Sequence, residues 1–375
     1  MSWPVVSLLD ALASAEVFVD GDWVESKDQD PAGDVRLVQL ADIGDGQYID
    51  KSNRFLTSAK ARELRCTFLK PGDVMLARMP DPLGRACIFP GDAKSAVTVV
   101  DVCIIRPDAQ GHDARWLMHC LNAPACRNQI ASFATGTTRS RISRGNLGKI
   151  RIPLPPLPEQ RRIAEVLERA EALRAKRRTA LAQLDTLTQA IFLDMFGDPA
   201  TNPKGWPTAP LGDLTKLKSG EFLPASEMAE AGEYPVLGGN GINGFHDRYM
   251  FEQPQIIIGR VGVYCGCVHA SPRNSWVTDN ALFVSARSPR LNFEYLFHAL
   301  IHARLNQYAS RSGQPLVSGS RIYPVRILVP PIDLQKDFEI RLATTDRLRS
   351  HSHASSAQLD SLFAALQHRA FRGEL

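Results

Sequence analysis

The stretch LPPLPEQRRIAEVLERAEALRAKRRTALAQLDTLTQAIFLDMFG, residues 154–197, predicts one long helix around which the rest of the chain can be placed. Prolines at positions 153, 155, 156 and 158 keep the segment before it extended, because proline fixes φ and disfavours the α conformation in the preceding residue. We therefore expect the helix to begin at Glu159. Gly197, followed by Asp198 and Pro199, predicts its end. About 37 residues at 1.5 Å each give a rod of roughly 55 Å, which needs a partner along its length.

Apolar residues recur every seven positions along this helix, as they do in a coiled coil. One predicted core row contains Ile163, Ala170, Leu184 and Ile191. The other predicted core row contains Val166, Leu173, Ala180 and Leu187. Arg177 falls in the first row, where it needs a polar neighbour.

The composition indicates a folded protein without a membrane span. A chain of 375 residues is long enough for two or three domains, and its net charge of +4 permits nucleic acid as a partner without arguing for it. No apolar run approaches the ~18 residues that span a bilayer, and the first residues lack the basic start of a signal peptide. The seven cysteines lie mostly among apolar neighbours, as packed thiols do. We therefore expect a cytoplasmic protein.

The same pattern of residues occurs twice in the chain. Trp3-Pro4 is echoed by Trp206-Pro207, and the apolar run that ends in Arg78 is echoed by the run that ends in Arg260. Further matched segments are 96–107 with 276–289, 135–139 with 312–315, and 150–156 with 325–331. Each copy leads into a long helix, so the chain consists of two copies of one unit.

The second long helix is predicted from about Leu334 to Phe371. Its predicted core rows are Phe338, Leu359 and Leu366 in one and Leu348 and Leu362 in the other, with Thr345, Ser352 and Ser355 in its middle. Two helices of similar length in one chain most simply cover each other as an antiparallel coiled coil, and the serines and threonine offer a polar environment for Arg177. The expected fold is α+β, with two similar mixed α/β domains separated by these helices. The expected boundaries are 1–153, 154–197, 198–329 and 330–375.

Several motifs resemble the specificity subunit of type I restriction-modification systems. They are PLPPLPEQRRIA at 153–164, FLDMFGD at 192–198, GWP at 205–207, YPVLGGNG at 234–241 and GQPLV at 313–317. The resemblance covers the whole chain, and within residues 1–135 it is a likeness of pattern only. It implies two target-recognition domains that each read one half of a bipartite sequence in double-stranded DNA. It also implies that the helices set the gap between the halves.

The resemblance further implies a non-catalytic chain that binds two modification (methyltransferase) subunits, with restriction subunits able to join. No cofactor and no metal are expected in this chain, because the S-adenosylmethionine used to methylate adenine belongs to the partner. The sequence agrees, since neither Asn122-Ala-Pro124 nor Asp198-Pro-Ala200 matches the motif that holds a flipped adenine. A rod of roughly 55 Å corresponds to about 16 base pairs at 3.4 Å each.

Candidate DNA contacts are basic residues at matching places in the two copies, because arginine reads guanine and any cation holds phosphate. The first copy has a run without an acidic residue, which contains Arg139, Arg141, Arg144, Lys149 and Arg151. The predicted DNA-binding set is Arg78, Arg139, Arg141, Arg144, Lys149, Arg260, Arg311, Gln314 and Arg321. A solvated basic surface is an equally good interpretation of such runs. For Arg78 and Arg260 the alternative is a structural arginine paired with a carboxylate such as Asp81 or Asp279.

Two patterns suggest other chemistry and have simpler explanations. Residues 239–244 fit G-x-G-x-x-G, but no helix is expected after them, so a glycine turn is the preferred interpretation. Cys265, Cys267 and His269 would share one face of a strand, yet no fourth zinc ligand follows at a usual spacing.

Two alternative functions remain open from the sequence. One is the same recognition module in a related complex whose modification and cleavage activities are fused in one partner chain. The other is a coiled-coil adaptor that binds proteins and not DNA. Salt-sensitive DNA binding separates the adaptor from the recognition subunits.

Overall fold

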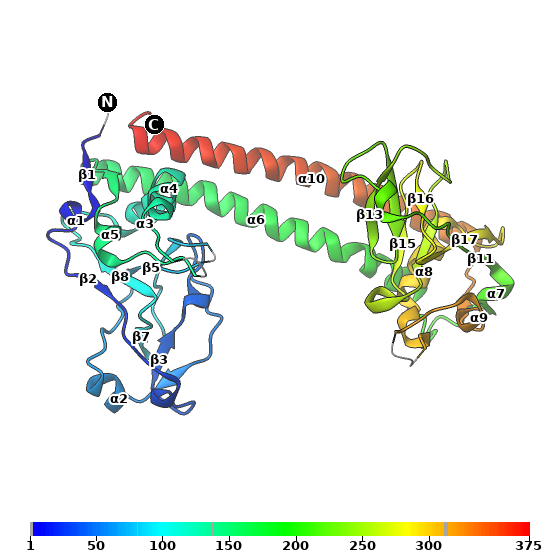
Figure 1. Cartoon of the computed structure of the whole chain (residues 1–375), viewed down its shortest axis with the longest axis horizontal. Helices are drawn as coiled ribbons and strands as arrows, with labels where there is room; N and C mark the ends of the chain where they lie inside the picture. Colours follow the sequence, from blue (N-terminus) through cyan, green and yellow to red (C-terminus); the bar gives the residue numbers. More distant parts are fainter. Residues whose placement is uncertain (1–2, 81, 137–138, 311–313) are drawn as a thin grey trace. The chain divides into compact units, whose positions relative to one another are not determined.

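Two long helices, α6 (Leu157–Phe196) and α10 (Ile332–Arg372), follow the two copies of the repeated unit. The computed structural model describes residues 3–80, 82–136, 139–310 and 314–375, apart from the side chain of Asp185 (Figure 1). The chain divides into two compact units, here called unit 1 (Met1–Arg178 with Ser355–Leu375) and unit 2 (Thr179–Ala354). Each unit therefore contains one mixed α/β domain and a part of both long helices.

Unit 1 contains three small sheets. A four-stranded antiparallel sheet has the order β2 (Val17–Asp20), β8 (Val102–Arg106), β5 (Val74–Ala77) and β6 (Ala86–Ile88). A three-stranded sheet has the order β4 (Phe55–Leu56), β3 (Val35–Val38) and β7 (Ser95–Thr98), and β1 (Val5–Ser7) pairs with β9 (Arg151–Pro153). The helices are α1 (Leu8–Ala11), α2 (Ser58–Glu63), α3 (Ala114–Asn122), α4 (Pro124–Ser132) and α5 (Arg144–Gly148), with the 3-10 helices η1 (Ser26–Asp28) and η2 (Leu40–Asp42).

Unit 2 repeats this architecture. Its four-stranded antiparallel sheet has the order β11 (Thr215–Ser219), β17 (Ala281–Arg287), β14 (Ile256–Gly259) and β15 (Val268–Ala270). Its three-stranded sheet has the order β13 (Gly241–His246), β12 (Tyr234–Gly238) and β16 (Trp276–Val277), and β10 (Thr208–Pro210) pairs with β18 (Arg326–Leu328). The helices are α7 (Leu211–Leu214), α8 (Phe293–His302) and α9 (Gly319–Ile322), with the 3-10 helices η3 (Ala225–Glu227), η4 (Gly262–Tyr264) and η5 (Leu305–Tyr308). The predicted duplication is confirmed.

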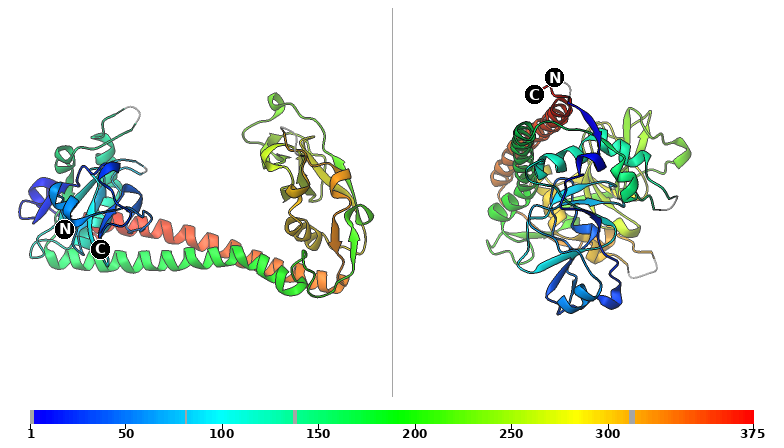
Figure 2. Two further views of the ribbon diagram at one scale, coloured as in Figure 1. Left: turned by 90° about the horizontal axis from the view of Figure 1, so that it is seen from below. Right: turned by 90° about the vertical axis from the view of Figure 1, so that its left-hand side faces the viewer.

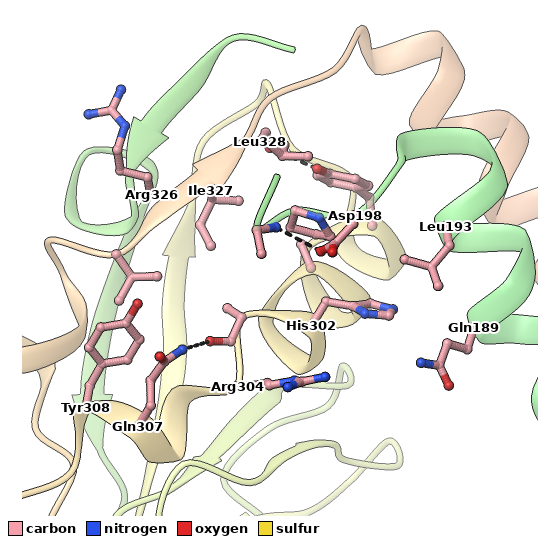
Figure 3. Close-up of a pocket in the computed structure, with 16 residues that line it drawn as sticks. Gln189, Leu193, Asp198, His302, Arg304, Gln307, Tyr308, Arg326, Ile327 and Leu328 are labelled. Carbon is pink, nitrogen blue, oxygen red and sulfur yellow. Dashed lines mark hydrogen bonds between the residues drawn. The ribbon is translucent and has the colours of Figure 1, made fainter. Parts of the chain in front are cut away.

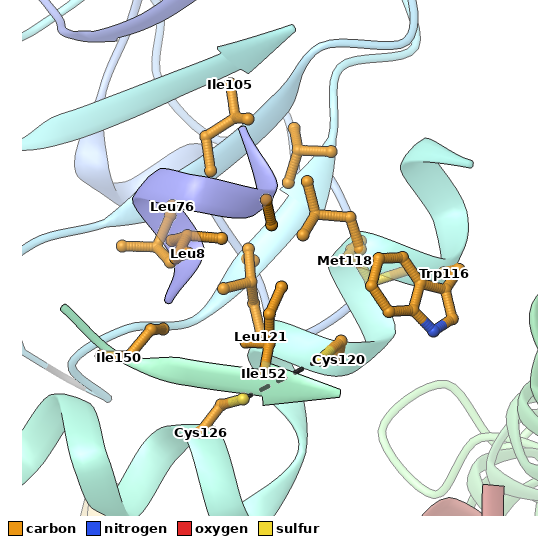
Figure 4. Packing of buried hydrophobic residues seen from close by; sticks show 14 of the residues in the cluster. Leu8, Leu76, Ile105, Trp116, Met118, Cys120, Leu121, Cys126, Ile150 and Ile152 are labelled. Atoms are coloured by element: carbon orange, nitrogen blue, oxygen red, sulfur yellow. Dashed lines mark hydrogen bonds between the residues drawn. The ribbon is translucent and has the colours of Figure 1, made fainter. Parts of the chain in front are cut away.

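The core of unit 1 joins the sheet, α3 and the long helices. Trp116 of α3 is fully buried among residues that include Leu76, Ile105 and Ile152 (Figure 4). Ala370 of α10 belongs to the same cluster, so the end of the chain contributes to the first domain's core. All seven cysteines are free thiols and six are buried, which confirms the predicted packed thiols.

The helix boundaries agree closely with the sequence. Gly197 follows α6 with φ of +79°, a conformation that glycine adopts without strain, and it ends the helix as predicted. α6 begins at Leu157, two residues before the predicted start, because Pro158 fits the first helical turn, where its missing N–H has no bond to lose.

A buried glutamine fixes the start of each long helix to the domain before it. Gln160 accepts a hydrogen bond from the Asp113 N–H at 2.9 Å, and its amide donates to the Pro155 carbonyl at 2.9 Å. Gln335 accepts from the Asn292 N–H at 2.7 Å and donates to the Pro330 carbonyl at 2.8 Å. Asp113 and Asn292 are the N-caps of α3 and α8, so the same contact joins helix and domain in both units.

Within each unit the described parts of α6 and α10 lie side by side and run in opposite directions (Figure 2). In unit 1, Arg174 donates to Asp360 at 2.7 Å and Arg177 donates to the Ser355 hydroxyl at 2.7 Å. A later residue of α6 thus contacts an earlier residue of α10, as antiparallel helices require. The second bond gives Arg177 the polar neighbour that the sequence predicted. In unit 2, the Phe196 and Phe338 rings pack with their centroids 5.3 Å apart.

The predicted core rows of the two helices are half right. The row through Ile163 and the row through Phe338 face inward as predicted. The other row is wrong by one residue in both helices, since Leu173 is 57% exposed and Leu362 is 55% exposed. The inward row lies four residues after the first row and runs through Leu167, Arg174 and Leu181 in α6, and through Leu342, Arg349 and Phe363 in α10. The pattern of apolar residues did not reveal this row in α6, because the row contains Arg174. The Arg174 guanidinium lies 4.4 Å from the centre of the Phe363 ring.

A histidine occupies the same place in both repeated helices, and His119 is buried while His298 is partly buried. Burial lowers the pKa of His119 in α3 and of His298 in α8 to about 4. An unfolded histidine has a pKa near 6.5, so as the pH falls below 6.5 the unfolded chain takes up protons before the folded chain does. Stability contributed by these neutral imidazoles is complete above pH 6.5 and is lost progressively toward pH 4.

We expect the free energy of unfolding of unit 2 to fall by about 2 kcal/mol between pH 7.5 and pH 5 on account of His298. His298→Leu, which cannot titrate, should remove most of that difference, and His119→Leu should do the same in unit 1. Urea unfolding at the two pH values measures it. An unchanged pH dependence in the leucine variants would contradict the assignment.

Among the described residues, no helix combines the length and apolarity that crossing a bilayer requires.

Candidate nucleic-acid interface

One end of the four-stranded sheet carries the same main-chain framework in both units. The Arg78 N–H donates to the Asp101 carbonyl at 2.8 Å, and the Arg78 carbonyl accepts from the Ile142 N–H at 3.1 Å. In unit 2 the Arg260 N–H donates to the Asn280 carbonyl at 3.0 Å, and the Arg260 carbonyl accepts from the Val317 N–H at 2.8 Å. Arg78 directly follows β5 and Arg260 directly follows β14, which have equivalent places in the two sheets. This confirms that the sequence comparison matched the correct residues.

A loop closes over this framework in each unit. In unit 1, Thr135 and Arg141 exchange two main-chain hydrogen bonds of 2.9 and 2.8 Å. In unit 2, the Ser310 N–H donates to the Leu316 carbonyl at 2.9 Å. A short helix follows the loop in both cases, α5 after Ser143 and α9 after Ser318. Among the described residues of the predicted set, Arg139 and Arg141 lie on the unit 1 loop, Arg144 and Lys149 in or directly after α5, and Arg321 in α9.

The cations of the unit 1 loop and helix differ in their surroundings. Arg139 is exposed and has no hydrogen-bond or ion-pair partner within the described part of the chain. Arg141 pairs with Asp101 at 3.2 Å, Arg144 donates to the Phe18 carbonyl at 3.3 Å, and Lys149 donates to Asn146 at 3.2 Å. Arg144 and Lys149 are exposed, so three cations of the predicted set face solvent here.

Arg78 is held inside unit 1. Its side chain forms an ion pair with Asp20 at 2.7 Å and donates to the carbonyls of Ile142 and Val100, and it is 5% exposed. This placement matches the alternative interpretation, a structural arginine, with Asp20 as the carboxylate. Asp81, which the sequence suggested, lies outside the described residues. Arg78 fixes the loop to the sheet and offers little surface to a ligand.

In the second unit, Arg260 has the same place in the framework as Arg78, but its side chain has different partners. Arg260 is half-buried and donates to the Ser219 hydroxyl at 3.2 Å and to the Asp279 carbonyl at 3.4 Å, so it contacts the main chain of Asp279 and not the carboxylate that the alternative required. Gln314 and Arg321 are exposed. Arg311 lies outside the described residues.

Two exposed aromatic residues were missed by the sequence analysis. Trp23 is 68% exposed and Phe222 is 72% exposed, and each follows a glycine and an acidic residue after the first strand of its sheet. The repeated order Gly-acid-aromatic, at 21–23 and 220–222, is the signal that could have identified them. Trp23 shares a groove of about 440 Å³ with Val100 and Asp101, the turn that also contacts Arg78 and Arg141. Exposed aromatic side chains can stack on bases or insert between them.

The two patterns set aside in the sequence form ordinary structure. Residues 239 and 240 make the turn between β12 and β13, which pair antiparallel, so the glycine turn is confirmed. Cys265 lies in a turn after η4 and only Val268–Ala270 form a strand, so the expected strand across all three zinc candidates is wrong. Among the described residues, no group of three or more histidine, cysteine or acidic side chains could hold a metal ion.

Unit 2 also contains a pocket that the sequence did not predict. It has a volume of about 570 Å³ and is bordered by α8, η5, β18 and the end of α6 (Figure 3). None of the predicted DNA-binding residues lines it. Its volume falls within the range of ligand-binding pockets.

Comparison with known proteins identifies the family. A family model described as the type I restriction modification DNA specificity domain matches residues 34–184 and 203–359. The type I restriction enzyme EcoprrI specificity subunit of Escherichia coli is 34% identical over 129 residues, which are 33% of this chain and 32% of that protein. A putative MjaX specificity subunit of Methanocaldococcus jannaschii is 19% identical over 96% of this chain and 90% of its own.

The fold agrees with a solved structure. The S subunit of a type I restriction-modification system from M. genitalium superposes with a TM-score of 0.62 at 15% identity, over 99% of this chain and 96% of that one. The duplicated mixed α/β domain with its long helices is thus a known fold. Since the family model covers most of the chain in two matching segments, the chain belongs to the family of type I restriction modification DNA specificity domains.

Proposed function

We propose that this chain is the non-catalytic DNA-recognition subunit of a type I restriction-modification enzyme. Each repeated domain, within 1–153 and 198–329, reads one half of a bipartite sequence, and α6 with α10 sets the gap between the halves. Two modification subunits bind the chain and methylate adenine with S-adenosylmethionine, and restriction subunits join the same cytoplasmic complex. Membership of the family supports a role in DNA sequence recognition.

The observation that carries the proposal is the repeated placement of exposed polar and basic residues over one framework. Arg139, Arg144 and Lys149 in unit 1, and Gln314 and Arg321 in unit 2, lie on the loop and short helix that follow the same hydrogen bonds. A duplicated basic surface suits a duplex that is contacted twice. Trp23 adds an exposed aromatic ring in the groove that it shares with Val100 and Asp101, and Phe222, also exposed, is its counterpart in the sequence of unit 2.

Exposed leucines on the long helices support protein partners as well. Leu173 and Leu362 in unit 1, and Leu187 and Leu348 in unit 2, are between 38% and 57% exposed. Exposed apolar side chains repeated along a helix are typical of protein contacts. We assign these leucines to the modification subunits. The alternative with a fused modification and cleavage partner uses the same surfaces, and the adjacent gene distinguishes it.

Salt-dependent DNA binding tests the DNA-binding surface. In the complex with its modification subunits, Arg139→Ala or Arg321→Ala should make the slope of log K against log salt less negative by about one, because each removes one phosphate contact. Arg169→Ala is the matched control, since Arg169 is 82% exposed on α6 and lies outside the loop. Fluorescence anisotropy with a cognate duplex measures the slopes. DNA binding that is absent, or that ignores salt, would support the adaptor alternative instead.

A further inference from the structure

One edge of strand β18 in unit 2 lacks a partner. β18 pairs with β10 through Ile327, and the flanking bonds run from the Leu211 N–H to the Val325 carbonyl and from the Val329 N–H to the Pro207 carbonyl. Alternate residues of an antiparallel strand bond to the same neighbour, so Arg326 and Leu328 direct their main-chain N–H and C=O groups to the opposite edge. That edge borders the 570 Å³ pocket (Figure 3).

The equivalent edge in unit 1 is closed. Strand β9 pairs with β1 in the same register, which makes Arg151 the counterpart of Arg326 and Pro153 the counterpart of Leu328. The Gln129 side-chain amide accepts from the Arg151 N–H at 2.8 Å and donates to the Arg151 carbonyl at 3.0 Å. Gln129 thus makes the two bonds that an added strand would make, and Pro153 has no N–H to satisfy.

The same elements leave the edge open in unit 2. The sequence Asn-Gln-x-Ala-Ser occurs at 128–132 and again at 306–310, so Gln307 is the counterpart of Gln129. Gln307 instead donates to the Ala303 carbonyl at 3.0 Å, one helical turn back along its own segment (Figure 3). No described residue bonds to the main chain of Arg326.

Leu328 adds a second open group. Its carbonyl accepts from the Tyr295 hydroxyl at 2.9 Å, but its N–H has no acceptor among the described residues, although Leu328 is only 3% exposed. A buried N–H without an acceptor costs free energy, so such groups in folded proteins usually have a partner. Proline at this place would remove the cost, as it does at position 153.

The pocket beside this edge suits an extended peptide. Arg326 offers a donor and an acceptor and Leu328 offers a further donor, at the spacing of alternate residues in a strand. The DNA backbone carries only acceptors, so it cannot satisfy the Arg326 carbonyl. Arg304, which is exposed and held with φ of +47°, and Gln189 point toward one another across the pocket, whereas the Arg326 side chain points away and donates to Thr208. The Arg304 guanidinium favours an acidic side chain in the bound segment.

We propose that the outer edge of β18 binds an extended, acidic segment of a modification subunit, which adds a strand beside Arg326 and accepts the Leu328 N–H. The open edge is independent of the proposed function, but the identity of the partner rests on it. Because unit 1 closes its edge with Gln129 and Pro153, the described parts of β9 and β18 offer one such site, on β18. Only one of two bound modification subunits therefore uses it.

Hydrogen exchange on the full chain tests the site directly. Adding the modification subunit should slow exchange of the Arg326 and Leu328 amides at least tenfold, while the Arg151 amide, which is already bonded, should not change. Protection produced by a DNA duplex alone would overturn the proposal. Protection that grows with the concentration of this chain alone, as a second copy would cause, would also overturn it.

Leu328→Pro, which places in unit 2 the residue that unit 1 has at 153, should weaken binding of the modification subunit about tenfold, the value of one hydrogen bond to a buried N–H. Leu328→Val keeps the N–H and should bind within twofold of the parent. Equal affinities for both variants would exclude the bond. If the complex forms and methylates a two-part sequence while the amides stay unprotected, the docking site is wrong and the proposed function stands. If neither complex nor methylation occurs, the proposed function fails, and with it the partner assignment.

Discussion

Exchanging residues 1–152 for those of another specificity subunit should replace one half of the methylated sequence and leave the other half unchanged. We expect one parental half-site to be lost entirely and a new half-site to replace it. The exchange keeps β1 with Arg151 and Ile152 of its partner strand β9, and its junction lies one residue before the end of β9, at Pro153. It leaves every contact within unit 2 intact, including the Arg260 framework. Sequencing of methylated bases in cells that express the hybrid with its partners measures the result.

The reciprocal exchange of residues 198–329 is the matched control and should replace only the other half. Arg144→Ala is a smaller version of the same test and should relax recognition in one half alone. A hybrid in which both halves change together would contradict independent reading by the two domains. A hybrid that methylates the parental sequence would place recognition outside residues 1–152.

Lengthening both long helices by seven residues should widen the gap between the half-sites by about three base pairs and change neither half. Seven residues add about 10 Å to a helix, and each base pair rises 3.4 Å. The insertions belong after Arg178 in α6 and after Ala354 in α10, where the two compact units meet along the chain. A whole heptad keeps the inward rows in phase, so Arg177 and Ser355 can still bond.

An insertion in only one helix is the control for helix pairing. The insertion would change the register of α6 against α10 on one side of the inserted residues. The Arg174–Asp360 contact of unit 1 and the Phe196–Phe338 contact of unit 2 could then not form together. We expect such a variant to lose stability and methylation. A doubly lengthened chain that methylates the parental spacing would show that the helices do not set the gap.

Much of the fold could be predicted because the determining residues act locally. The prolines before α6, Gly197 after it and the repeated Trp-Pro and Pro-Pro segments each specify local backbone conformation. The offset of one core row could not be predicted from apolarity. Leu173 and Leu187 look like core residues, whereas the inward row contains Arg174, which is buried along its stem by Phe363 of a helix far away in the sequence.

The candidate interface was only partly predictable for the same reason. Sequence placed Arg78 and Arg260 at equivalent strand ends, but it could not show that Asp20 lies 2.7 Å from Arg78 and holds it inside the domain. Arg139 and Arg321, which are exposed, could be predicted because each lies in a basic segment without acidic residues. Trp23 and Phe222 were missed because an aromatic residue near a strand is normally expected in the core, and exposure depends on tertiary structure.

The most direct measurement is base-resolved methylation mapping of DNA from cells that express this chain with its neighbouring modification subunit. The account predicts methylated adenines in two short sequences separated by one fixed gap, with methylation lost when this chain is omitted. Methylation at a single continuous word, or the same methylation without this chain, would contradict it.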